Sequence, residues 1–189
     1  LWFLKRLLLQ RRSLFVVLVI FVAWALAVAL RVGPAELDAQ DRVTLFRDGV
    51  GPFLIAAVVL LISMLYATAA FAQEIEEKTI FLLLTRPYPR SRLLRDKAIA
   101  AWLASAVPSA LAVALPAATM LPLDDPTARA IGLAYLGAAL LASTAYAALF
   151  LRIGLAASRP MVWAAGIALG WEGLVGTTPG NLQLFTIQH

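Results

Sequence analysis

Residue types that could carry out catalysis or hold a metal are scarce in this sequence. Cysteine is absent, and the single histidine, His189, is the last residue. The sequence contains no Gly-x-x-x-x-Gly-Lys-Ser/Thr stretch for binding ATP, no His-Glu-x-x-His zinc motif and no Gly-x-Ser-x-Gly nucleophile motif. The carboxylates Asp124 and Asp125 are paired, but they lie between Pro122 and Pro126, so we interpret them as acidic residues of a turn. We therefore predict that the chain is not an enzyme and has no catalytic, cofactor-binding or metal-binding residues.

The segment at residues 74–92, EIEEKTIFLLLTRPYPRSR, carries the other chemistry of interest, that of a docking site. It combines glutamates and basic residues with the apolar run Ile80–Leu84, which is too short to cross a bilayer. Pro87 and Pro89 disfavour helix, so we predict a short helix, a stiff elbow and a second helix that begins near Ser91. Two interpretations are open: a solvated loop whose leucines touch lipid head groups, or a rigid projection whose apolar patch docks a partner.

The elements that must position this segment are apolar helices. Hydrophobic residues make up 62% of the 189 residues and charged residues only 14%, which is more apolar sequence than a soluble core uses. A helix needs about 20 residues to cross a hydrocarbon core of about 30 Å. We predict an all-α, polytopic helical membrane protein with one transmembrane domain over residues 1–189. Its five spans are predicted at about residues 13–31, 51–73, 98–121, 130–151 and 160–175.

Lysine and arginine are distributed unevenly between alternate connections. Of the 16 basic residues, 12 fall on the side of the N-terminus and of residues 74–92, and the other 4 fall on the opposite side. The 12 are Lys5, Arg6, Arg11, Arg12, Lys78, Arg86, Arg90, Arg92, Arg95, Lys97, Arg152 and Arg159, and the 4 are Arg31, Arg42, Arg47 and Arg129. The positive-inside rule therefore predicts a cytoplasmic N-terminus and a cytoplasmic 74–92 segment. Because these charges separate apolar runs and form no basic face of a folded domain, nucleic-acid binding is not expected.

Two motifs carry a resemblance to a known family. Residues 74–100, EIEEKTIFLLLTRPYPRSRLLRDKAIA, resemble the connection between the second and third spans of type-2 ABC transporter permeases. The C-terminal stretch GWEGLVGTTPGNLQLFTIQH resembles the segment that follows the fifth span in such permeases. We name residues 74–92 the coupling segment, because the resemblance implies that it docks a soluble ATPase. Its predicted partner-coupling residues are Glu74, Glu76, Glu77, Thr79, Phe81, Leu83, Leu84, Arg86, Pro87 and Arg90.

The resemblance also implies the assembly in which the chain works. Two copies of about six spans each would pair, giving a homodimer in the plasma (inner) membrane of a prokaryote, so a further span is expected after residue 189. ATP and Mg²⁺ would be bound by the ATPase partner and not by this chain. The predicted function is the transmembrane subunit of an ATP-driven ABC transporter. The alternative is a non-transporting membrane scaffold that anchors a cytoplasmic partner through the same segment.

Three further groups of residues are candidates within the spans. Gly166 and Gly170 are four apart, which favours close helix packing and is compatible with a subunit interface. Glu172 is an ionisable residue close to a span boundary and is a candidate gate. Hydroxyl-bearing residues of the second and fourth spans could line a polar path or could bond their own helix backbone: Ser63, Tyr66, Thr68, Ser143, Thr144 and Tyr146.

Overall fold

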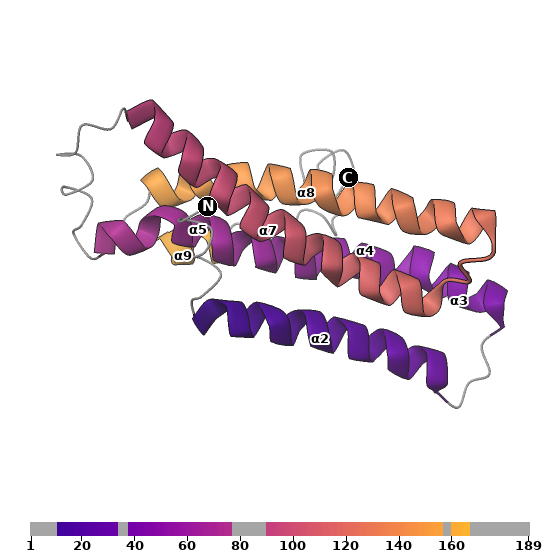
Figure 1. The fold of residues 1–189 in the computed structure, drawn as a ribbon. Helices are drawn as coiled ribbons and strands as arrows, with labels where there is room; N and C mark the ends of the chain where they lie inside the picture. Colours follow the sequence, from indigo (N-terminus) through magenta and orange to yellow (C-terminus); the bar gives the residue numbers. More distant parts are fainter. Residues whose placement is uncertain (1–10, 34–37, 77–89, 157–159, 167–189) are drawn as a thin grey trace, which may run out of the picture.

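The described part of the chain is a bundle of long helices. The structure, a computed structural model, describes residues 11–33, 38–76, 90–156 and 160–166. Within these ranges only short connections are not helical, which confirms the predicted all-α class. Four helices of the described part are long and apolar enough to cross a membrane: Ser13–Val32, Ala39–Ala69, Arg95–Met120 and Pro126–Ala156. The chain is therefore a multi-pass membrane protein (Figure 1).

The first helix, α2 (Arg11–Val32), lies at the side of the bundle (Figure 1). It packs mainly on α7 through one narrow stripe, in which Val16, Ala23 and Ala27 are buried at helical spacing. Large apolar side chains elsewhere on α2, such as Leu14 and Val17, are exposed. In a bilayer such side chains meet lipid tails, so their exposure within the monomer carries no hydrophobic penalty.

A continuous helical run from Ala39 to Glu76 contains the second predicted span. Its parts are, in order, α3 (Ala39–Leu45), the π-helical η1 (Phe46–Val50), α4 (Gly51–Phe53), the π-helical η2 (Leu54–Val59) and α5 (Leu60–Glu76). The run begins well before the expected start at residue 51. Asp38 caps it, with one carboxylate oxygen 2.7 Å from the backbone nitrogen of Ala39. Phe46, fully buried, then anchors this early part to the bundle.

The next two helices form a hairpin. α7 (Arg90–Met120) continues through Pro108 and Pro116, and α8 (Pro126–Ala156) runs back along it (Figure 1). Asp125 caps α8, because its carboxylate oxygens accept from the backbone nitrogens of Thr127 at 3.0 Å and Ala128 at 3.3 Å. This supports the interpretation of Asp125 as a turn residue. The short α9 (Pro160–Gly166) follows, and it covers the described beginning of the fifth predicted span.

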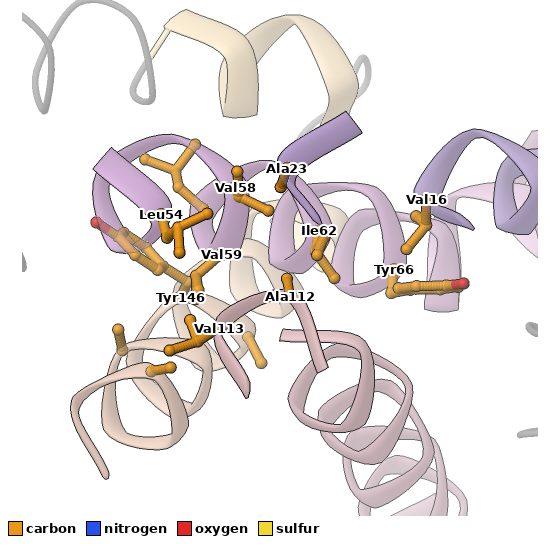
Figure 2. Close-up of a cluster of buried hydrophobic side chains, with 14 of the residues drawn as sticks. Val16, Ala23, Leu54, Val58, Val59, Ile62, Tyr66, Ala112, Val113 and Tyr146 are labelled. Carbon is orange, nitrogen blue, oxygen red and sulfur yellow. The ribbon is translucent and has the colours of Figure 1, made fainter. Parts of the chain in front are cut away.

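The core lies where η2 and α5 meet α7 and α8. Figure 2 shows side chains from α2, η2, α5, α7 and α8 in this cluster: Val16, Ala23, Leu54, Val58, Val59, Ile62, Tyr66, Ala112, Val113 and Tyr146. The ring of Tyr146 is stacked on that of Phe150, with centroids 6.0 Å apart. The run from η2 through α5 is therefore the central element of the bundle, and the coupling segment begins in its last residues.

Candidate functional site

The coupling segment begins and ends at one end of the bundle. Its first residues, Glu74 and Glu76, are in the last turn of α5, and Arg90 is the first residue of α7. Figure 1 shows the end of α5 and the start of α7 at the same end of the molecule, together with the start of α2 and the end of α8. The remaining predicted coupling residues lie outside the described residues: Glu77, Thr79, Phe81, Leu83, Leu84, Arg86 and Pro87. A partner that bound this segment would act on two long helices together.

The second helix predicted for the coupling segment is continuous with the third span. α7 begins at Arg90, one residue before the predicted start near Ser91, and it continues without a break into the third span. Near this end Arg92 and Arg95 are exposed, whereas Lys97 is only 2% exposed. Helical periodicity explains the contrast, because positions 92 and 95 are on one face and position 97 is turned toward the bundle. One face of α7 is thus packed against the bundle from its third turn onward.

The basic residues form two groups at opposite ends of the bundle. One group is at the end of the bundle where the coupling segment begins, in the first turns of α2 and α7 and the last turns of α8. Within the described part its members are Arg11, Arg12, Arg90, Arg92, Arg95, Lys97 and Arg152. The basic residues at the other end are in the last turn of α2, in the early part of the run Ala39–Glu76 and in the first turn of α8. They are Arg31, Arg42, Arg47 and Arg129. These are the same two groups that the sequence assigns to opposite sides of the membrane.

Helices α5 and α8 are in contact in the half of the bundle that carries the coupling segment. A Cβ placed on Gly154 would lie 3.4 Å from the backbone oxygen of Thr68 and 3.6 Å from its Cα atom. These are ordinary van der Waals distances, so an alanine would fit here, whereas the atoms of a longer side chain would meet the backbone of α5.

Two cross-helix hydrogen bonds join other pairs of helices in this half of the bundle. The Tyr66 hydroxyl of α5 donates to Ser13 Oγ of α2 at 3.1 Å. The Trp102 indole N–H of α7 donates to Thr144 Oγ1 of α8 at 2.9 Å. In a bilayer no water competes for these groups, and such bonds contribute about 0.6 kcal/mol each on average. They add modestly to the packing that sets the relative rotation of these helices.

The polar residues of the second and fourth spans mostly bond their own helices. Thr68 Oγ1 donates to the backbone oxygen of Met64 at 2.6 Å, and Ser143 and Thr144 donate to that of Leu140 at 2.9 and 2.7 Å. The own-backbone interpretation is confirmed for these three residues. In the described part Ser63 is fully buried and its hydroxyl has no hydrogen-bond partner. Within one copy Ser63, Thr68 and Ser143 are buried in the core, as Tyr146 is (Figure 2), whereas Thr144 is exposed.

Tyr135 of α8 contacts the helical run Ala39–Glu76 at the end far from the coupling segment. In the π-helical turn η1 the backbone N–H of Gly51 donates to the backbone oxygen of Phe46. In the same pattern the backbone oxygen of Arg47 would accept from residue 52, but Pro52 has no N–H. The Tyr135 hydroxyl instead donates to the Arg47 oxygen at 2.6 Å. Its ring also meets that of Phe46 edge-on, with centroids 5.5 Å apart. The structure thus replaces a missing backbone bond with a side chain from another helix.

α2 is joined to α7 at that same end. Arg31, in the last turn of α2, donates from Nη1 to the backbone oxygen of Thr119 at 2.8 Å. Thr119 is in the last turn of α7, where backbone oxygens have no intrahelical donor. A cation near a helix C-terminus is favourable on electrostatic grounds as well. Both ends of the bundle are therefore held by polar contacts between helices.

The remaining predicted residues are only partly described. Gly166 is the last residue of α9 and is exposed, and a Cβ added to it would have nothing within 4 Å, so it packs against no other described helix within one copy. Gly170 and Glu172 lie outside the described residues, and the interface and gate predictions stay predictions. Among the residues that the structure describes, there is no group of three metal-binding side chains.

Four residues that matter for these contacts were not predicted from the sequence: Tyr135, Gly51, Gly154 and Arg31. The dipeptide Gly51-Pro52 inside an apolar run was the available signal, because proline leaves a backbone oxygen that needs another donor. Nothing in the local sequence identifies Tyr135 as that donor, since it is far along the chain. Gly154 and Arg31 likewise depend on which helices are neighbours.

Comparison with known proteins gives one match. The model of a family described as ABC-2 family transporter protein matches residues 7–169, which include the coupling segment and most of the predicted spans. No match was found among curated proteins or among solved structures.

Proposed function

The chain belongs to the ABC-2 family of transporter proteins, since the match covers well over half of its length, and from this premise we propose an ATP-driven mechanism for it. As a member, it is a membrane permease component of an ABC transporter. We propose that two copies form the translocation pathway and that each docks a soluble ATPase through the coupling segment. The observation that carries the proposal is that α5 ends and α7 begins at one end of the bundle, on either side of this segment (Figure 1).

The proposed coupling path runs through α5 and α7. A push on the coupling segment when the ATPase pair closes would displace the end of α5 and the start of α7 together. The close contact of Gly154 with Thr68 would pass the movement to α8. The continuous α7 would carry it along the bundle to Thr119, where Arg31 holds α2. Rigid-body movement of packed helices between discrete arrangements is a common form of such switching.

The chemistry of the cycle would reside in the partner. We propose that ATP and Mg²⁺ bind to the ATPase and that this chain contributes no catalytic residue. The basic end of the bundle would face the cytoplasm under the positive-inside rule, which puts the coupling segment and the N-terminus on the ATPase side of the plasma membrane of a prokaryote. The second copy, the docked ATPase and the bilayer are the partners that this arrangement requires.

The test is to replace Leu83 and Leu84 together by aspartate in the full-length protein and to co-purify it with its ATPase. The variant should lose the ATPase, because carboxylates would stand where an apolar docking patch is expected. Leu123→Asp is the matched control, since Leu123 is an exposed leucine in the turn at the opposite end of the bundle. If the double variant keeps both the ATPase and transport, the coupling assignment is wrong.

The scaffold alternative predicts a different result. A scaffold would bind the ATPase but would not change shape with nucleotide. The chain has no cysteine, so a spin label can be introduced at any chosen site. With a label at Leu123→Cys in each copy, the proposed transporter should show distances between copies that change when ATP is added. Unchanged distances with a bound, active ATPase would favour the scaffold.

A further inference from the structure

An apolar groove lies between the last turns of α7 and the first turns of α8. Its volume is about 340 Å³, and its walls include Ala118 and Leu121 from one side and Leu133 and Leu136 from the other. Gly132 leaves space in the groove wall, because a Cβ at this position would lie 3.3 Å from Leu121 Cδ1. The volume is at the lower end of the range of about 300–1,000 Å³ that is typical of small-molecule sites.

Arg129 is the charged residue in the lining of this groove. It is in the first turn of α8, directly after the polar turn that joins the two helices, and its side chain is exposed. In the described part of the chain no carboxylate pairs with its guanidinium. The nearest acidic residue in the sequence, Asp125, precedes α8 and caps it, since its two oxygens accept from backbone nitrogens. The groove therefore combines apolar walls with one available cation near the membrane surface.

We propose that this groove binds a membrane phospholipid. One acyl chain would lie along the alanine and leucine walls, and the phosphate would accept hydrogen bonds from the Arg129 guanidinium. A guanidinium matches a phosphate with two parallel hydrogen bonds. Water is a poor occupant, because it needs several polar partners that these walls do not supply. The inference does not depend on ATPase coupling and goes beyond the proposed transport function.

The main competing occupant is an apolar helix from another protein or from a second copy. Small residues such as Ala118 and Gly132 would accept a helix equally well. However, a helix lying over Arg129 would bury its charge unless it brought a carboxylate to this position. A phospholipid supplies the counter-charge without that requirement, because its phosphate lies where a transmembrane hairpin turns back at the bilayer surface. The charge thus favours lipid.

The test measures lipid binding to the full-length protein, purified in detergent. Phosphatidylethanolamine is titrated in, and bound molecules are counted by native mass spectrometry. Arg129→Gln should weaken binding by about tenfold, as loss of one charge-assisted hydrogen-bonded pair implies. Ala118→Leu should weaken it too, by filling the groove from an exposed position of α7. Diacylglycerol, which lacks the phosphate, should bind equally to the parent protein and to Arg129→Gln.

Matched controls separate the groove from the rest of the surface. Ala134→Leu adds the same bulk at an exposed position of α8 outside the groove lining, and Arg152→Gln removes an exposed arginine at the other end of the same helix. Both should bind the lipid as the parent does. Unchanged binding in Arg129→Gln and in Ala118→Leu would overturn the proposal. So would an Ala118→Leu variant that keeps its lipid but loses its second copy, because the groove would then be a protein contact.

Discussion

Replacing Gly51 by alanine should destabilise the protein, although alanine is the better helix former. A Cβ on Gly51 would lie 2.6 Å from Cε1, 2.7 Å from Cζ and 2.9 Å from Cδ1 of Tyr135. Carbon atoms prefer a separation of about 3.5–4.0 Å, so the ring would have to move by about 1 Å. The ring cannot move freely, because its hydroxyl is bonded to the Arg47 oxygen and its face is met by Phe46. Alanine would also suffer from the following Pro52, since Gly51 has helical backbone angles of φ −59° and ψ −53°.

The size of the effect follows from these contacts. Overpacking of a well-packed site costs about 1–3 kcal/mol. Loss of the Tyr135 hydrogen bond would add about 0.5–1.5 kcal/mol, and loss of the aromatic pair a similar amount. The helix propensity of alanine offsets about 1 kcal/mol. The net expectation from these contributions is a loss of about 3 kcal/mol, which corresponds to a Tm lower by about 6–12 °C for a chain of this length.

The assay is thermal unfolding in detergent, followed by tryptophan fluorescence. Gly137→Ala is the matched control, because nothing lies within 4 Å of a Cβ at Gly137 in the same bundle, and it should raise the Tm. Gly51→Ala should also be tested in a Tyr135→Ala background, where the cost should fall because only the proline term remains. If Gly51→Ala is as stable as the parent, or costs the same in both backgrounds, the ring contact does not constrain this site.

Three further substitutions test the contacts between helices, each by the same unfolding assay. Tyr135→Phe leaves the Arg47 oxygen without its donor and should lower the Tm by about 2–4 °C, whereas an unchanged Tm would mean that another group satisfies this oxygen. Gly154→Leu should separate α5 from α8 and lower both the Tm and ATPase-coupled transport, and normal transport would contradict the coupling path. Trp102→Phe removes one interhelical hydrogen bond of about 0.6 kcal/mol, so a shift of only about 1–2 °C is expected, and a larger shift would show that the indole also has a packing role.

Hydropathy determined the fold class because a membrane helix is specified by its own composition. A stretch such as residues 13–31 is apolar over the length that a bilayer requires, and in lipid its backbone must be helical to satisfy its own polar groups. The structure has α2 from Arg11 to Val32 at this place. Local sequence was less informative at helix starts. The helical run begins at Ala39 because Asp38 caps it and Phe46 is buried against α8, and burial is not a local property.

The coupling segment could be proposed from sequence because its chemistry is concentrated in consecutive residues. Glutamates, an apolar run and closely spaced prolines from residue 74 to residue 92 are visible without knowledge of the fold. The alternatives for the hydroxyl residues could not be separated in this way. A threonine such as Thr68 can turn toward a path or toward its own helix, and the hydrogen bond to the Met64 oxygen shows the second arrangement.

By itself, the sequence determined that this is a helical, multi-pass membrane protein with a segment that concentrates charges, apolar residues and prolines, because those properties depend on composition and on neighbouring residues. Only the tertiary structure decided that α5 packs against α8 at Gly154. It alone identified Tyr135 as the donor for an oxygen that Pro52 cannot satisfy, and Arg129 as the cation beside an apolar groove. The physical reason is that a contact between helices depends on their relative rotation and depth, which are set by packing across the whole bundle.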